Sequence, residues 1–75
     1  MPRTRNANPS SETATYYCWT ESYDITVQAS SPQAAAAKAM GGECEWVGSE
    51  SEDGVHSEVF EDAYRGTVNV AKEGN

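Results

Sequence analysis

The sequence predicts a small α+β domain: an antiparallel sheet of four to five strands with one α-helix packed on one face, in the order β-β-α-β-β. Residues 23–30 alternate apolar and polar side chains without interruption, which is the period of a strand with one solvated face. Residues 31–42 contain a Ser-Pro pair, a run of alanines and a Gly-Gly pair, which are typical of the start, body and end of a helix. A chain of 75 residues has room for one hydrophobic core, so we expect one domain.

The first eleven residues differ in composition from the rest of the chain. They contain Pro, Asn, Arg and Ser but no large apolar side chain after Met1. Such a segment cannot bury enough surface to offset the entropy lost on ordering. We therefore expect residues 1–11 to form a flexible N-terminal tail and residues 12–75 to form the α+β domain.

Two strands are expected before the helix. Residues 13–20 are rich in β-branched and aromatic side chains and carry large groups on both faces. The short polar link Glu21-Ser22 joins them to residues 23–30, which indicates an antiparallel hairpin. In the second strand, the side chains expected to face the core are Tyr23, Ile25, Val27 and Ala29.

The helix is expected to begin after Ser31 and to span about nine residues. Ser31 offers a capping hydroxyl, and Pro32 suits the first helical position because its missing N–H has no intrahelical partner there. The alanines carry no reactive group and allow the helix to lie close to a sheet. We therefore expect a scaffold helix packed across Ile25 and Val27, with Met40 buried.

The second half of the chain is expected to form further strands. Residues 43–48 alternate acidic and apolar side chains, which points Cys44 and Trp46 inward. Residues 49–54 are expected to form a polar turn that ends in Asp-Gly, and residues 55–60 to return as a strand. Residues 61–64 interrupt the alternation, and residues 67–71 are a possible short terminal strand. Truncating Trp46 to Ala is expected to cost about 3 to 5 kcal/mol as a buried aromatic.

The two cysteines are expected to be free thiols. Cys18 and Cys44 do not form a C-x-x-C pair, and the N-terminus leads into no apolar signal region. A chain without such a signal stays in the reducing cytoplasm. A disulfide is possible only if the strands that carry the two cysteines are neighbours.

The net charge excludes one class of function. Five Lys and Arg residues stand against twelve Asp and Glu, for a net charge of −7 and an isoelectric point near 4.4. Such a chain has little electrostatic attraction for a phosphate backbone, so we do not expect direct nucleic-acid binding. No apolar run approaches the roughly 20 residues of a membrane span, so we expect no membrane association.

The sequence carries no motif of a catalytic, metal or cofactor site. His56 is the only histidine. On a strand, Glu58 is the one nearby acidic residue whose side chain shares a face with His56. Two ligands are fewer than the three or four that zinc takes from a protein. No nucleophile elbow, phosphate-binding loop or dinucleotide fingerprint is present. We therefore expect neither an enzyme nor a bound cofactor or metal.

The strongest functional indication is an acidic stretch without a single Lys or Arg between its ends. Uncompensated charges repel one another, so a small domain that keeps them is expected to gain in association with a basic partner. Tyr23 and Tyr64, together with Tyr16 and Trp19, are expected to supply aromatic anchors for such an interface. The acidic residues expected to bind the partner are Glu43, Glu45, Glu50, Glu52, Asp53, Glu58, Glu61 and Asp62.

In layout, the chain resembles anti-CRISPR proteins of phages and mobile elements. The resemblance covers residues 13–71 and consists of a strand running into Ser31-Pro32, an alanine-rich helix and an acidic hairpin. It implies a small cytoplasmic inhibitor that binds a CRISPR effector complex. The surfaces of such a complex that hold guide RNA, read the PAM or admit target DNA are lined with Lys and Arg. An acidic face could occupy one of them by imitating phosphate.

Two functions therefore remain open. In the first, the protein is an inhibitor that docks its acidic hairpin on a basic nucleic-acid-binding surface of a protein or ribonucleoprotein complex. In the second, it is a small accessory or adaptor protein that oligomerises or joins a complex through its aromatic residues, and its acidic residues serve solubility.

Overall fold

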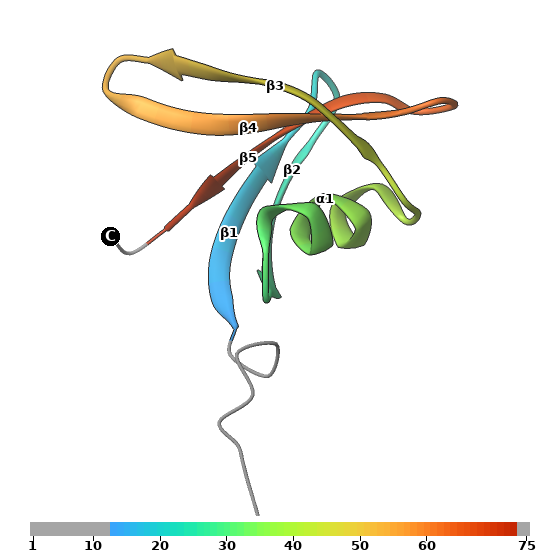
Figure 1. Cartoon of the computed structure of the whole chain (residues 1–75), viewed down its shortest axis with the longest axis horizontal. Coiled ribbons are helices and arrows are strands. Elements are labelled where there is room, and N and C mark those ends of the chain that lie inside the picture. Colours follow the sequence, from blue (N-terminus) through green and yellow to red (C-terminus); the bar gives the residue numbers. More distant parts are fainter. Residues whose placement is uncertain (1–12, 74–75) are drawn as a thin grey trace, which may run out of the picture.

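The computed structural model describes residues 13–73, which form one five-stranded antiparallel sheet and one helix (Figure 1). The α+β fold class predicted from the sequence is thereby confirmed, whereas the expected tail at residues 1–11 lies outside the described residues. In chain order the elements are β1 (Ala14–Trp19), β2 (Asp24–Ala29), α1 (Pro32–Met40), β3 (Glu45–Glu52), β4 (Val55–Asp62) and β5 (Gly66–Lys72).

The last strand lies in the middle of the sheet. The strand order is β2-β1-β5-β4-β3, so β5 pairs with β1 on one side and with β4 on the other. The possible short terminal strand is therefore a full strand that joins the β1–β2 hairpin to the β3–β4 hairpin. Helix α1 packs against β2, β1, β5 and β4 on the inside of the curved sheet, and the β3–β4 hairpin tip extends beyond it (Figure 1).

The helix begins and ends at the predicted residues. The Ser31 hydroxyl accepts the Ala34 N–H at 3.1 Å, and Pro32 is the first helical residue. Gly41 adopts a left-handed φ of 80° and donates its N–H to the Ala37 carbonyl, which ends the helix. These local signals explain why nine residues form a helix in a chain that is otherwise mostly strand.

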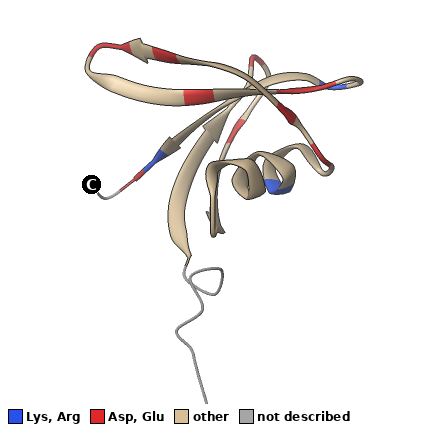
Figure 2. Ribbon diagram, viewed as in Figure 1, with Lys and Arg blue, Asp and Glu red and all other residues tan. Residues whose placement is uncertain are grey.

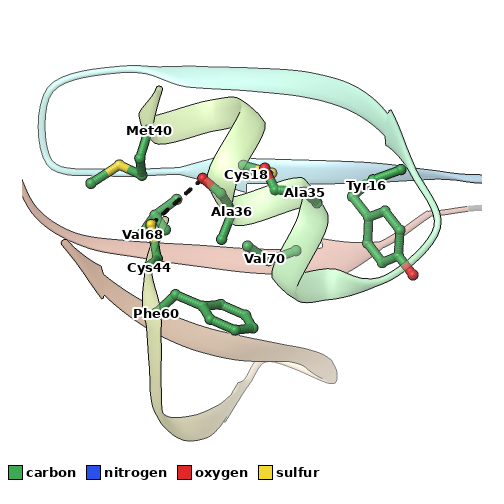
Figure 3. Close-up of a cluster of buried hydrophobic side chains, with 10 residues drawn as sticks. Tyr16, Cys18, Ala35, Ala36, Met40, Cys44, Phe60, Val68 and Val70 are labelled. Carbon is green, nitrogen blue, oxygen red and sulfur yellow. Dashed lines mark hydrogen bonds between the residues drawn. The ribbon is translucent and has the colours of Figure 1, made fainter. Parts of the chain in front are cut away.

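The core lies between this helix and the centre of the sheet (Figure 3). Ala35 and Ala36 are fully buried, and their small side chains allow the helix to approach the strands closely. Beneath them lie Cys18 of β1 and the two valines of β5, Val68 and Val70. The remaining buried hydrophobic side chains are Tyr16, Ala29, Met40, Cys44 and Phe60.

Three residues expected to face the core are exposed. Tyr23 is 44% exposed, Ile25 is 42% exposed and Trp46 is 57% exposed, so the prediction of a core position was wrong for all three. The reason is the central position of β5, whose valines fill the space under the helix. Strands β2 and β3 are the sheet edges, and the nine-residue helix leaves their outer side chains uncovered. Val27 is partly buried against the core, and Met40 is buried as expected.

Strand β3 is longer than predicted and contains a bulge. Residues 49–52, expected in a turn, continue the strand, and Asp53 and Gly54 alone form the turn, with φ values of 54° and 80°. The expected Asp-Gly hairpin turn is thus confirmed at its two central residues. Trp46 pairs with Phe60 while Gly48 pairs with Val59, which leaves Val47 as the extra residue.

The bulge changes which face the following residues occupy. Phe60 and Val59 point to opposite faces of the sheet, so their partners Trp46 and Gly48 do as well. In a regular strand, with Val47 paired and no bulge, Trp46 and Gly48 would share a face. Glu50 and Glu52 therefore lie on the face opposite to Trp46, although regular alternation would put all three together.

Strand β4 also continues further than predicted. It ends at Asp62, so the interruption expected at residues 61–64 begins two residues later, as a turn of residues 63–65. Both cysteines are buried free thiols on the helix side. The expected free thiols are therefore confirmed, and the strand order places Cys18 on β1 away from the edge strand β3 that follows Cys44. Burial raises the pKa of both thiols.

Candidate functional site

The face of the sheet opposite α1 is not covered by any element among residues 13–73, and we call it the open face. Tyr17 and Trp19 of β1 belong to it, because they alternate with Tyr16 and Cys18, which are buried under the helix. The register brings side chains of the other strands to the same face. Besides these two aromatic residues, the open face carries Asp24, Asn69, Val55, Ser57, Glu50 and Glu52, and at the other end of the hairpin Glu45 and Glu61.

Tyr17 and Trp19 form a stacked aromatic pair on this face. Their ring centroids are 5.3 Å apart and the ring planes differ by 28°. The Tyr17 hydroxyl donates a hydrogen bond of 2.8 Å to Oδ2 of Asp24 on the neighbouring strand β2. This bond to a carboxylate raises the pKa of the Tyr17 phenol. The pair is therefore held in place from the side of β2.

A polar network holds the opposite side of the open face. The Asn69 side-chain amide donates to Oε1 of Glu50 at 3.0 Å and to the hydroxyl of Ser57 at 3.1 Å. The aromatic pair and this network border one shallow hollow of about 390 Å³. Its other lining residues come from the β3–β4 hairpin and are Glu52, Asp53 and Val55.

The carboxylates of the open face have no cationic partner within residues 13–73. The ion pairs found there join Arg65 to Asp62 and His56 to Glu58. Lys72 pairs in register with Tyr16 and so lies on the helix side of β5, and Lys38 donates to a backbone carbonyl of β2. Figure 2 shows acidic residues along the β3–β4 hairpin and basic ones on the helix, the β4–β5 turn and the end of β5.

The eight acidic residues predicted to bind a partner do not form a single surface. Glu50, Glu52 and Asp53 lie together at the hairpin tip, on the open face. Glu45 and Glu61 face each other on the same face at the other end of the hairpin, away from the tip, and Glu43 lines a smaller hollow with them. Like charges directly opposite each other repel, so the pair of Glu45 and Glu61 destabilises the hairpin slightly.

Glu58 lies on the helix side in a network of its own. The Trp46 indole donates to its Oε1 at 2.7 Å, and His56 Nε2 lies 2.6 Å from its Oε2. These hydrogen bonds, that of Trp46 first, lower the pKa of Glu58. Ser51 Oγ lies 3.4 Å from His56 Nδ1, so a serine, a histidine and a carboxylate form a row of contacting side chains. The imidazole is 62% exposed, so water surrounds this group and it has no pocket for a substrate.

Asp62 is buried and has a structural role. Its Oδ1 accepts the backbone N–H groups of Tyr64 and Arg65, and its Oδ2 lies 3.3 Å from the Arg65 guanidinium. These bonds, that of the Tyr64 N–H first, lower the pKa of Asp62 and close the β4–β5 turn. Asp62 is therefore not available to bind a partner through this carboxylate.

Replacing Asp62 tests this role. We expect Asp62→Ala to lower the melting temperature by on the order of 5 °C, because two backbone N–H groups of the β4–β5 turn lose their acceptor. Asp62→Asn keeps the acceptor oxygen but not the charge. Because the folded pKa of Asp62 lies below its unfolded value, its charge stabilises the wild type above about pH 4, and this stabilisation is lost as the pH falls further. In melting curves between pH 7 and pH 2, Asp62→Asn should therefore lose less stability than the wild type, and equal losses would contradict this role.

The two tyrosines predicted as anchors differ in their surroundings. Tyr64 is 95% exposed at the β4–β5 turn and is free to contact a partner. The Tyr23 hydroxyl donates to the Ala39 carbonyl at 2.7 Å, which ties the start of β2 to the end of α1. Of the other two aromatic candidates, Tyr16 is buried in the core and Trp19 lies on the open face. Sequence reasoning missed Tyr17 and Asp24, although the alternation of Tyr17 and Trp19 with Tyr16 and Cys18 was visible.

No family model, curated protein or solved structure matches the chain. Within residues 13–73, no group of three or more His, Cys, Asp or Glu side chains is arranged to hold a metal ion. No helix of that same part of the chain has the length and apolar character needed to cross a bilayer. The open face, with its stacked aromatic pair beside acidic side chains, is the candidate functional site.

Proposed function

We propose that the protein is a small inhibitor that binds a basic, nucleic-acid-binding surface of a cytoplasmic effector complex. A CRISPR effector complex of the host of a phage or mobile element is the partner that the resemblance implies. The observation that supports this proposal best is the open face, where Glu50, Glu52 and Asp53 lie beside an aromatic pair and no Lys or Arg of residues 13–73 neutralises them. Such a surface attracts Lys and Arg and repels phosphate.

The aromatic pair supports protein binding over nucleic-acid binding. Aromatic side chains on a sheet face also stack with bases in single-stranded DNA and RNA, but those sites combine them with a positively charged groove. Here the charged residues around Tyr17 and Trp19 are carboxylates, with Asp24 on one side and Glu50 on the other. The same rings can anchor a protein interface, since Tyr and Trp are common there.

The salt dependence of binding tests this function. Purified CRISPR effector complexes, loaded with guide RNA, are immobilised and the full chain is passed over them at low and at a few tenths molar salt. We expect binding to weaken on the order of tenfold at the higher salt, since exposed charge pairs are screened over a Debye length of about 8 Å at physiological ionic strength. Target DNA should compete with the protein. Equal affinity at both salt concentrations, or binding that DNA leaves unchanged, would contradict electrostatic docking.

An accessory or adaptor function is the alternative, and the exposed apolar side chains favour it. Trp46, Val47, Val55 and Tyr64 are all at least half exposed. An interface built on them would be nearly indifferent to salt. The salt experiment therefore separates the two functions, and sedimentation of the protein alone shows whether it oligomerises through these residues.

A further inference from the structure

We propose that the hollow on the open face binds an arginine side chain of the partner, with the guanidinium over the Tyr17–Trp19 pair and the carboxylates of the hairpin tip around it. This inference rests on the proposed function, because it names the group of the basic surface that is recognised. It is argued from two observations in the same hollow: an exposed aromatic pair, and acidic side chains without cations among residues 13–73.

The shape and charge of the hollow fit a flat cation. A guanidinium is planar and weakly hydrated, stacks on aromatic rings, and presents five N–H donors to surrounding acceptors. Glu50, Glu52 and Asp53 supply carboxylate oxygens at the border of the hollow, and Val55 adds an apolar wall for the methylene groups of the side chain. A lysine ammonium keeps its hydration more strongly and cannot stack as a plane, so it fits the same site less well.

The site is held in place before any partner binds. Asp24 fixes the Tyr17 hydroxyl, and Asn69 holds the Glu50 carboxylate while also contacting Ser57. Fewer side chains then lose freedom when the cation enters, which favours affinity. The register of all five strands places these residues together, so the site depends on the folded sheet and not on one segment.

The two tryptophans provide an internal control for the experiment. Trp19 lies in the hollow, and Trp46 lies on the helix side, bonded to Glu58. Peptides of repeated Arg-Gly-Gly, Lys-Gly-Gly or citrulline-Gly-Gly units are titrated into the ¹⁵N-labelled full chain, and the two indole N–H signals are followed by NMR. We expect the arginine peptide to shift the Trp19 signal saturably and to leave the Trp46 signal nearly unchanged. The lysine peptide should bind several times more weakly and the neutral citrulline peptide should not shift the signal. Equal binding of arginine and lysine peptides, or equal shifts of both indoles, would overturn the proposal.

Variants then separate the ring from the charges. Trp19→Leu should weaken binding of the arginine peptide by about fivefold to tenfold, since a cation over an aromatic face contributes about 1 kcal/mol. Peptide binding to this variant is followed by the backbone amide signals of the neighbouring strands, and these signals also report whether the variant folds. The exposed pair Glu50→Gln with Glu52→Gln should weaken binding similarly without disturbing the core, whereas the matched pair Glu45→Gln with Glu61→Gln should not. Wild-type affinity in the Glu50 and Glu52 variant would overturn the proposal even if Trp19→Leu failed to fold.

The same variants distinguish this inference from the proposed function. If Trp19→Leu keeps the full salt-dependent binding to an effector complex, the arginine site is wrong and electrostatic docking stands. If the arginine peptide binds at Trp19 but the protein binds no effector complex, the arginine site is correct and the proposed function is wrong.

Discussion

Replacing Phe60 by Ala is expected to unfold the domain at room temperature. Phe60 is 3% exposed and lies in the core with Val68, its partner on β5. Removing a buried Phe side chain costs about 3 to 5 kcal/mol, and a domain of this size has little more than that in total. Circular dichroism should show the loss of the sheet, and a cooperative melting curve like that of the wild type would contradict this account of the core.

Trp46→Ala is the matched control for Phe60→Ala. The two residues are direct partners across β3 and β4, but Trp46 is 57% exposed. Its truncation loses one exposed hydrogen bond to Glu58 and little burial, so we expect a cost of about 1 kcal/mol or less. This replaces the much larger cost that the sequence alone suggested for Trp46. A loss for Trp46→Ala as large as that for Phe60→Ala would show that the edge strand is packed more tightly than the structure describes.

Reversing two charges at the hairpin tip is expected to have the largest effect on binding. Glu50→Lys with Glu52→Lys turns the acidic border of the hollow basic and raises the net charge by four. Electrostatic steering raises association rates by about 10- to 1000-fold, so we expect association with a basic complex to slow by at least about tenfold. The exposed positions leave the core intact, and stability should stay the same or rise because repulsion is relieved. Stopped-flow or surface-based kinetics at low salt measure this.

A control with the same change in net charge separates local docking from overall attraction. Glu21 and Glu43 are exposed and lie outside the hollow. Glu21→Lys with Glu43→Lys should slow association clearly less than the hairpin-tip pair does. Equal slowing by both pairs would mean that net charge, and not the open face, governs association. Glu58 and Asp62 are unsuitable for such reversals, because Glu58 contacts both Trp46 and His56 and the buried Asp62 closes the β4–β5 turn.

The helix could be predicted to the residue because its signals are local. The Ser31 cap, Pro32 and the left-handed Gly41 act within a few positions of one another. The place of β5 in the sheet could not be predicted, since strand order depends on pairing between distant segments and no local pattern encodes it. The errors at Ile25 and Trp46 follow from this one omission.

The candidate site was only partly visible in the sequence. The acidic hairpin could be identified by counting charges, but the bulge at Val47, which turns Glu50 and Glu52 to the open face, could not be predicted. The structural role of Asp62 depends on a turn that only the fold shows. The contribution of Tyr17 required knowledge of which face of β1 the helix covers, and this face is set by packing rather than by the composition of β1 itself.

The bulge at Val47 makes the surface of the hairpin depend on chain length as well as on composition. An in-frame loss of the Val47 codon would remove the bulge and leave the other pairs of β3 with β4 in place, so Glu50 and Glu52 would stay on the open face. An in-frame loss of the Ser49 codon, with the bulge and the Gly48 pair kept, would carry Glu50 and Glu52 to the side of Trp46 and Ser51 to the open face. Both glutamates would be retained, yet the acidic border of the hollow would lose them. For this chain, an alignment that moves a one-residue gap freely within residues 47–49 would treat two proteins with opposite hairpin surfaces as near equivalents.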